Sequence, residues 1–464
     1  MKILQKEGKT GKNVPMLLLL AVGIIEFVFM TLESRFSGIG YYLAETYVIV
    51  PCLLFLGYIL REKRSPFASR RLVLAAAAVG WFVFVQCMHK LLDMGNHPMT
   101  TVFFVYLMGF PFAALSDDRD NRGLWWIGGV LTAASLVLVG YSACLVLGWV
   151  PESLRDVLYW DGSRLYALWH PNISACYFMI GIGFSAAFLE RTRKPWVKAL
   201  LLAGMVLQFL AMSLTNCRTM LLMTGALLGG IVFFRIFRGS WKQLLLGLLA
   251  AALVLAGSFK LSGVIFRWNN DHLVANLQAV QEETLPAAET EQTETEADPE
   301  SAEIDEAGII VSENWQGSLA ADMRTLNGRT IIWGSALRTI RDNRSLLLWG
   351  TEYPGLLISW YNPWEVVHSH NSWMEALMRM GLPGLLFSLV FTAMSLWSGA
   401  RLILGKGTER WKKTIAMTTL CVMVAGFLEP YLFITNVYYH ILDFVFFFCT
   451  GYLDYWCRPG QQTE

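Results

Sequence analysis

The chain has 464 residues, of which 55% are hydrophobic and 13% are aromatic, while only 16% are charged. This composition excludes an ordinary soluble domain and is typical of an integral membrane protein. The formal net charge of +1 argues against nucleic acid as a partner, because a surface that binds a phosphate backbone carries a surplus of basic residues.

Apolar stretches long enough to cross a bilayer recur along the chain. A spanning helix needs about 20 mainly apolar residues. The candidate spans are 14–32, 41–60, 71–92, 99–115, 124–149, 172–190, 197–215, 218–237, 243–260, 372–400, 413–430 and 431–456. They predict an all-α polytopic membrane protein with about 12 transmembrane helices.

The distribution of Lys and Arg predicts which loops face the cytoplasm. Positive charge close to a span resists export. If the N-terminus is cytoplasmic, basic clusters all fall inside, and they lie around Lys6, Arg61, Arg122, Arg193, Lys242, Lys412 and Arg458. The short outside segments hold only Arg35, Lys90, Arg155, Arg164 and Arg218. The pattern predicts a multi-pass protein of the cell (inner or plasma) membrane with both termini in the cytoplasm.

One large extracytoplasmic loop, 261–371, divides the chain. It separates helices 1–9, in residues 1–260, from helices 10–12 and a cytoplasmic tail, in residues 372–464. Its part at about 280–307 is acidic, and from Glu282 to Glu306 it contains no Lys or Arg. Such a segment cannot bury enough apolar surface to fold and is expected to be a disordered insertion. The part at about 320–371 is expected to be structured.

The structured part begins with an amphipathic pattern, NGRTIIWGSALRTIRDN. The apolar residues that recur at helical spacing are Ile332, Trp333, Ala336, Leu337 and Ile340, whereas Arg338, Arg341 and Arg344 fall on another face. The pattern predicts a helix with two possible settings. It could lie on the membrane surface, or it could pack on the helix bundle with its arginines near lipid phosphates.

Two outer segments place arginines at the membrane edge. TNCRTMLL puts Arg218 at the outer end of the eighth span, and DGSRLYALWHPNIS puts Arg164 and His170 just before the sixth. A charged residue at the edge of the hydrocarbon is costly, so these are candidates for a functional role. The alternative is snorkelling, in which the guanidinium reaches the headgroups.

The segment HSHNSWMEALMRMGLPG leads into the tenth span. Ser372 and Glu375 match a capping box, which predicts that the helix begins near Ser372 with His370 and Asn371 just outside. A helix N-terminus favours neutral imidazole and attracts anions, so a base and a phosphate site could share this place. The alternatives are an interfacial hydrogen-bonded His370 and, for Glu375 and Arg379, an intrahelical ion pair, which is the preferred interpretation of that pair.

Motifs for nucleotide, dinucleotide or metal binding are absent from the sequence. The chain has no P-loop, no G-x-G-x-x-G after a strand and no HExxH, and its eight cysteines lack the spacing of a zinc or redox site. We therefore expect neither a cofactor nor a metal, and any reaction outside the cell would use an already activated substrate.

The order and predicted sidedness of these segments resemble the O-antigen ligase and O-antigen polymerase superfamily, polytopic glycosyltransferases that use lipid-diphosphate-linked glycans. The resemblance is carried by RLYALWHPNISACYF, LTNCRTMLL, NGRTIIWGSALRTIRDN and HSHNSWMEALMRMGLPGLL, within roughly residues 160–390. Cys217 stands where the family usually has a small hydroxyl residue, Arg344 stands where proline is common, and WGTEYPG is a loose version of a Gly-x-Gly turn.

The resemblance implies roles for individual residues. His370 would deprotonate an acceptor hydroxyl, with His368 as the alternative base. The implied diphosphate-binding arginines are Arg218 and Arg329, supported by Arg164 and Arg338. Further supporting candidates are Asn371, His170 and Trp333. The implied partners are a polyprenyl-diphosphate-linked glycan donor, an acceptor that is a glycan, a lipid or a protein, and the lipid bilayer.

The sequence also leaves two other functions open. A transporter or lipid flippase would place charges deep in several spans, and only His440 and Asp443 in the last span fit that pattern. A cell-wall glycan polymerase of the shape, elongation and division type would use an external acidic residue. The candidates in the structured loop are Asp322, Asp342, Glu352 and Glu365.

Overall fold

A computed structural model describes most of the chain. The described residues are 70–91, 121–146, 149, 159–160, 164–165, 171–237, 239–274, 328–362, 365–366, 368–405, 407–433 and 440–458. The spans predicted at 14–32, 41–60 and 99–115, the acidic insertion, His170 and Asp322 lie outside these residues.

Helices make up nearly all of the described chain. The first group consists of α3 (Arg70–Leu91), α5 (Arg122–Val146), α7 (Pro171–Arg191), α8 (Pro195–Leu214), α9 (Arg218–Ile236) and α10 (Trp241–Asn269), which continues as a π-helix, η4 (Asn270–Val274). The second group consists of α13 (Arg329–Asp342), α14 (Leu346–Trp349), α15 (Pro354–Ser359), α16 (Ser372–Leu404), α17 (Arg410–Leu428) and α18 (His440–Trp456). Strands β1 (Tyr159–Trp160) and β2 (Arg164–Leu165) pair antiparallel before α7.

Seven helices of the described residues are long and apolar enough to cross a membrane. They are α5, α7, α8, α9, α10, α16 and α17. Every predicted span with described residues overlaps a helix, including the spans at α3 and α18. The structure is therefore that of an all-α polytopic membrane protein, while the total of 12 spans stays a prediction.

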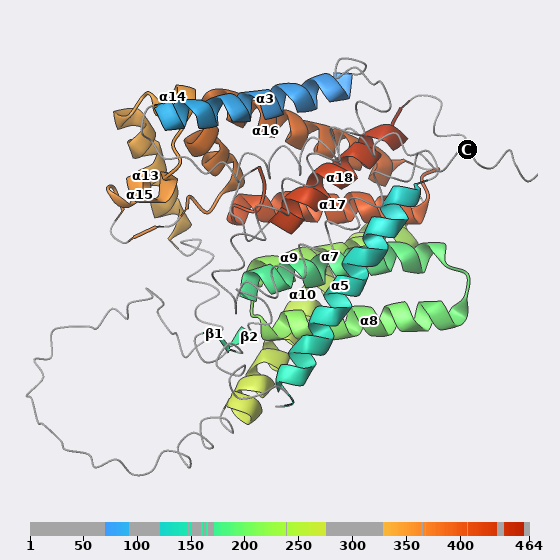
Figure 1. The fold of residues 1–464 in the computed structure, drawn as a ribbon. Helices are drawn as coiled ribbons and strands as arrows, with labels where there is room; N and C mark the ends of the chain where they lie inside the picture. The colour runs from blue at the N-terminus through green and yellow to red at the C-terminus, as the bar shows by residue number, and fades with distance from the viewer. Residues whose placement is uncertain are drawn as a thin grey trace, which may run out of the picture.

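The bundle is built around α7. Almost every residue from Pro171 to Ala187 is buried, because α5, α8, α9 and α17 all pack against this helix. Figure 1 shows α5 and α7–α10 on one side of the bundle and α3, α16, α17 and α18 on the other. Outward-facing leucines on α10, such as Leu245, Leu249 and Leu253, are exposed, as expected for side chains that face lipid.

Two predicted boundaries differ from the structure. Helix α10 runs to Asn269, so the predicted loop start at residue 261 lies inside this helix; residues such as Leu261 and Val264 continue its apolar outer surface. The span predicted at 431–456 is helical only from His440 among its described residues. Pro430 disfavours helical backbone at the preceding residue, so α17 stops before it and the chain continues in non-helical conformation.

Helix α16 is broken near its start. Gly381 has non-helical dihedrals (φ 68°, ψ −168°), and Pro383 cannot donate a backbone hydrogen bond. At the break, the carbonyl of Met380 accepts a hydrogen bond from Trp81 Nε1 of α3, at 2.9 Å. The predicted tenth span is therefore two helical segments, and the first of them, ending at Met380, supports the site described below.

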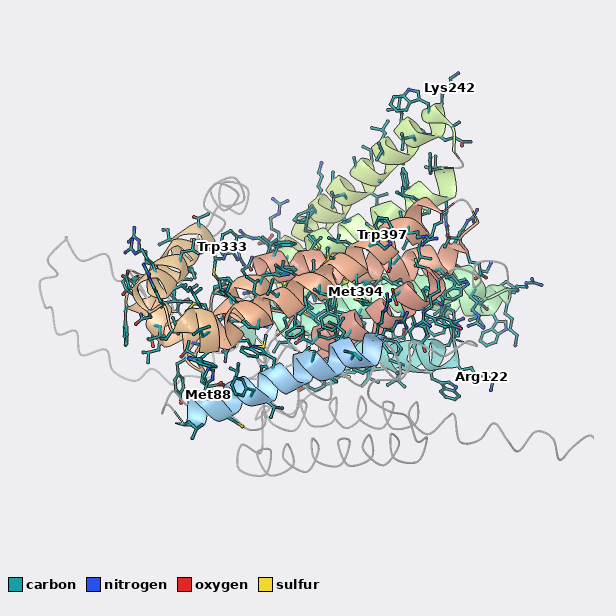
Figure 2. All side chains as sticks on the ribbon, turned by 90° about the horizontal axis from the view of Figure 1, so that it is seen from above. Met88, Arg122, Lys242, Trp333, Met394 and Trp397 are labelled. Atoms are coloured by element: carbon teal, nitrogen blue, oxygen red, sulfur yellow. The ribbon has the colours of Figure 1, made fainter. Side chains whose placement is uncertain are left out.

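The two ends of the bundle carry different groups. Figure 2 shows Trp333 and Met88 at one end and Arg122 and Lys242 at the opposite end. Trp333 belongs to the loop predicted to be extracytoplasmic, whereas Arg122 and Lys242 belong to segments predicted to be cytoplasmic. The fold thus separates the two sets of residues in the way that the charge pattern requires.

Two glycines allow α14 to pack directly on the break in α16. Gly350 has φ of 67°, and a Cβ there would lie 2.2 Å from the carbonyl carbon of Arg379. Gly381 has φ of 68°, and its Cβ would lie 2.5 Å from the carbonyl oxygen of Leu348. Both glycines have a positive φ and lie against the backbone of another segment, and only glycine tolerates this combination.

Replacing Gly350 with Ala should lower the free energy of unfolding, by about 1–3 kcal/mol from backbone strain alone. Replacing Gly334 with Ala is the matched control, because a Cβ at this position in α13 meets nothing within 4 Å. The control should be neutral or stabilising by about 0.5–1 kcal/mol. Thermal unfolding of the purified proteins in detergent tests this prediction, which fails if the two variants melt alike.

Candidate active site

A buried carboxylate joins two of the predicted site residues. Glu429 follows α17 and is 6% exposed. One of its oxygens pairs with Arg329 Nη2, at the start of α13, and the other lies 3.0 Å from Nδ1 of His370. The end of α17, the start of α13 and the turn before α16 therefore meet at Glu429.

The ionisation of Glu429 fixes the hydrogen on the imidazole. Burial would raise the pKa of Glu429, but the hydrogen bond with His370 and the charges of His370, Arg329 and His368 lower it to about 2. An ionised carboxylate only accepts hydrogen bonds, so Nδ1 of His370 is the donor in this contact. In the neutral ring, Nε2 then keeps its lone pair, as a general base requires.

The backbone of the turn that carries His370 is strained, and neighbouring side chains hold it in place. His370 has φ of 50°, in the left-handed region that non-glycine residues rarely adopt. Its neighbour Ser369 is buried, and the Ser369 carbonyl accepts a hydrogen bond from Trp333 Nε1 at 3.0 Å. Trp333, predicted as a supporting residue, thus holds the backbone beside His370.

Asn371 begins the helix that follows the turn. Its Oδ1 accepts hydrogen bonds from the backbone N–H groups of Trp373 and Met374, at 3.0 and 2.9 Å. Its Nδ2 donates to the carbonyl of Phe427 at 3.1 Å. Asn371 therefore caps α16 and ties it to the end of α17.

The predicted capping box at Ser372 is wrong, although the helix does begin there. Ser372 Oγ donates to the carbonyl of Glu429 at 3.0 Å and accepts from the N–H of Leu432 at 2.9 Å. The hydroxyl is occupied by the segment after α17, so the amide of the preceding residue, Asn371, takes over the capping role. Glu375 forms the expected ion pair with Arg379, with 2.9 Å between Oε1 and Nε.

His368 lies beside His370 and faces it edge to face, with 4.2 Å between ring centroids. Burial and the neighbouring charge of His370 lower the pKa of His368 to about 4, against the opposing effect of Glu375 and Glu429. Its Nδ1 is buried with no hydrogen-bond partner among the described residues. The carboxylate contact that orients an imidazole therefore goes to His370 rather than to His368.

His368, His370 and Glu429 are also the described residues that could hold a metal ion. Their candidate ligand atoms lie within 4.8 Å of one another. In the structure, however, Arg329 offsets the charge of Glu429 and His370 donates to it. We therefore interpret His370 and Glu429 as a hydrogen-bonded base and acid, with His368 packed beside them.

Two further arginines lie at the start of α9. Arg164 of β2 donates from Nε to the carbonyl of Thr215 and from Nη2 to Oδ1 of Asn172, both at 2.9 Å. Arg218 is the first residue of α9 and is half-buried. Arg164 and Arg218 are close enough for the charge of one to act on the other. The fold thus concentrates positive charge here.

Cys217 connects this pair to the carboxylate cluster. The charges of both Arg164 and Glu429 act on its sulfur, so the two groups border the same region. Burial raises the pKa of Cys217 to about 11, which keeps the thiol protonated at neutral pH. Only the thiolate is a strong nucleophile, so Cys217 does not serve as one.

Arg338 is not brought into this cluster by any contact among the described residues. Its side chain is exposed on the outward face of α13, because Ile332, Ala336 and Ile340 bury the opposite face. The packing of that apolar face against α15 and α16 favours the bundle-packed alternative for this helix. His170 lies outside the described residues.

Glu429 was missed as a candidate in the sequence. It stands in the segment GFLEPYLF, at the outer end of an apolar span. The argument that singled out Arg218, that a charge at the membrane edge is costly, applies equally to this carboxylate. The proline after it is a further signal, because it marks the end of the helix.

Replacing His368 with Gln should make thermal stability less sensitive to acid. The fold lowers the pKa of His368 to about 4 from its usual 6.5. Between these values the unfolded chain binds more protons, so the free energy of unfolding falls as the pH drops through this window. In the native protein, the free energy of unfolding should fall by about 3 kcal/mol between pH 7 and pH 4 because of His368. Thermal unfolding from pH 7 to pH 4 measures it, and equal acid sensitivity in both proteins would contradict the prediction.

Part of the chain matches a known family. Residues 203–389, from within α8 to within α16, match the family model described as O-antigen ligase. The matched region contains Arg218, Arg329 and His370. A comparison with curated proteins finds no match.

Proposed function

We propose that this chain, a member of the O-antigen ligase and polymerase superfamily, transfers a glycan from a polyprenyl-diphosphate carrier to an acceptor hydroxyl at the extracytoplasmic face of the cell membrane. The observation that carries the proposal is the contact of Glu429 with both His370 and Arg329. Glu429 orients the imidazole of His370, which can act as a base, and it binds the cation of Arg329. Both lie next to the arginine pair at the start of α9, Arg164 and Arg218. Both termini are cytoplasmic in this proposal.

His370 is the base of the proposed reaction. Its Nε2 takes the proton from the acceptor hydroxyl, and the hydroxyl oxygen forms a bond to the anomeric carbon of the donor sugar. The bond between that carbon and the diphosphate oxygen breaks, and the polyprenyl diphosphate leaves with the electron pair. Glu429 stabilises the imidazolium that forms, because its negative charge faces Nδ1.

The arginines stabilise the leaving diphosphate. Guanidinium groups present planar arrays of donors that suit phosphate oxygens, and they act strongly in a partly desolvated site. Arg218 and Arg164 supply this charge at the start of α9. Arg329 has five N–H donors, so binding Glu429 and contacting a diphosphate are compatible roles.

Several observations weigh against the other two functions. The site lies where helices end, at α9, α13 and α17, rather than at mid-span charges as a transporter would need. Asp443 of α18 accepts a hydrogen bond from the Phe433 N–H, which gives it a structural role. Among the external acidic residues, Asp342 pairs with Arg341 and Glu352 is buried near Arg379.

The nature of the acceptor distinguishes the two versions of the proposed activity. A polymerase transfers the glycan to another lipid-linked glycan, whereas a ligase transfers it to a different acceptor, such as a lipid or a protein.

Replacing His370 with Ala should lower kcat about 10²–10⁴-fold, which is the contribution of a positioned general base. Replacing Arg218 or Arg329 with Ala should lower it about 10²–10³-fold, since each removes a charge that stabilises the leaving group. The assay incubates purified protein in vesicles with a labelled polyprenyl-diphosphate glycan. Label then appears in a polymer or on a separate acceptor.

Arg341→Ala is the matched control for Arg329→Ala. Both residues belong to α13, but Arg341 is exposed and pairs with Asp342. The control should keep the turnover of the native protein. Unchanged turnover in the His370, Arg218 and Arg329 variants together would refute the proposed function, as would movement of labelled lipid across the bilayer without glycan transfer.

Replacing Glu429 with Gln should lower kcat by about 10²–10⁴-fold while the protein stays folded. The amide of Gln can donate a hydrogen bond to Nδ1, and this would place the ring hydrogen on Nε2, where the acceptor proton must go. Glu409→Gln is the control, because Glu409 pairs with Lys412 at the other end of α17. Full turnover in the Glu429 variant would show that the carboxylate does not orient the base.

A further inference from the structure

A second buried carboxylate lies behind the His370 turn. Glu375, in the first segment of α16, is 2% exposed. Its Oε2 accepts hydrogen bonds from both the backbone N–H and the hydroxyl of Ser369, each at 2.8 Å. The residue immediately before His370 is thus held at two atoms by one carboxylate oxygen.

The other oxygen of this carboxylate is held by Arg379. Nε of Arg379 donates to Oε1 of Glu375 at 2.9 Å, and Nη1 of Arg379 donates to the carbonyl of Glu352 at 3.2 Å. The carboxylate of Glu352 lies 3.6 Å from Arg379 and 3.8 Å from Nδ1 of His89 in α3. A chain of buried polar contacts therefore runs from α3 to the His370 turn.

These contacts stabilise the strained backbone of the turn that carries His370. His370 sits in a strained left-handed conformation, which persists only where the surrounding structure over-determines it. Ser369 supplies that restraint, because its N–H and hydroxyl bind Glu375 and its carbonyl binds Trp333. An intrahelical ion pair that served only to stabilise α16 would not need its acid buried against the turn.

We infer that Glu375 is a positioning residue for the proposed base: Arg379 orients its carboxylate, and through Ser369 this carboxylate fixes the turn that places His370. The inference rests on the proposed function, because it concerns the residue assigned as the base. It deepens that proposal by extending the site one layer behind the imidazole. Neither Glu375 nor Arg379 is assigned a contact with substrate.

Glu375→Gln tests the inference with almost no change in shape. A carboxylate can accept hydrogen bonds at both oxygens, whereas an amide has one oxygen and one N–H₂ group. The N–H₂ group of Gln must therefore face another hydrogen-bond donor, either the N–H of Ser369 or the Nε–H of Arg379. We expect kcat to fall about 10–100-fold through misplacement of the base. The KM for the donor and its Kd should stay within about twofold, since the arginine pair at α9 is untouched.

Ser369→Ala is the second variant, and it keeps the Glu375–Arg379 ion pair intact. It removes one of the two contacts to Oε2, so kcat should fall less, about 3–10-fold. In the double variant the two losses should be less than multiplicative, because both changes act on one contact. Glu190→Gln is the matched control: Glu190 pairs with Arg235 on α9 and should keep native turnover.

The results separate this inference from the proposed function. If His370→Ala is inactive while Glu375→Gln and Ser369→Ala keep the native kcat, the positioning role is refuted and the proposed function stands. A rise in KM at unchanged kcat would refute it equally. If the His370, Arg218 and Arg329 variants are all fully active, the proposed function itself fails. If Glu375→Gln does not fold, the kcat and KM of Ser369→Ala test the inference: a lower kcat at unchanged KM supports it, and a native kcat refutes it.

Discussion

The ion pair and hydrogen bond at Glu429 are the interactions on which the rest of the site depends. A buried carboxylate is costly unless it is paired and hydrogen-bonded, and among the described residues the partners of this one come from distant parts of the chain. Arg329 lies 100 residues before it and His370 lies 59 residues before it. The acid thereby fixes the relative positions of α13, α16 and α17, and it also sets the tautomer of the imidazole.

Strain and buried charge accumulate at the same end of the molecule. His370 has a left-handed backbone, α16 breaks at Gly381, and Glu375 and Arg379 are paired beneath the turn. The rest of the bundle is a packed apolar core around α7. Local rules are broken at the candidate active site, and they are obeyed where the chain needs only to pack and to face lipid.

The sequence was informative wherever the pattern was long or local. The apolar runs predicted the helices because about 20 apolar residues in a row have few other solutions in a membrane protein. The amphipathic pattern predicted α13 and its buried face of Ile332, Ala336 and Ile340, although Leu337 is exposed. Resemblance supplied Arg329 and His370, which the fold does bring together. It also supplied Arg338, which faces outward.

Short-range details were less predictable because competing groups come from elsewhere in the fold. Ser372 fits a capping motif, yet its hydroxyl is taken by the chain after α17, and Asn371 caps the helix instead. Nothing in the spacing of Glu375 and Arg379 shows that the acid also holds Ser369. Such choices depend on which donor is nearest, and that is known only once the helices are packed.

By itself, then, the sequence determined the helical membrane architecture and the types of residue available for chemistry. These follow from hydrophobicity, charge and periodicity, which act over neighbouring residues. Only the tertiary structure decided that Glu429 completes the site, that His370 rather than His368 receives its carboxylate, and that Glu375 lies behind the turn. Those are contacts between segments far apart in the chain, and each is selected by packing geometry and by the cost of leaving a buried charge without a partner.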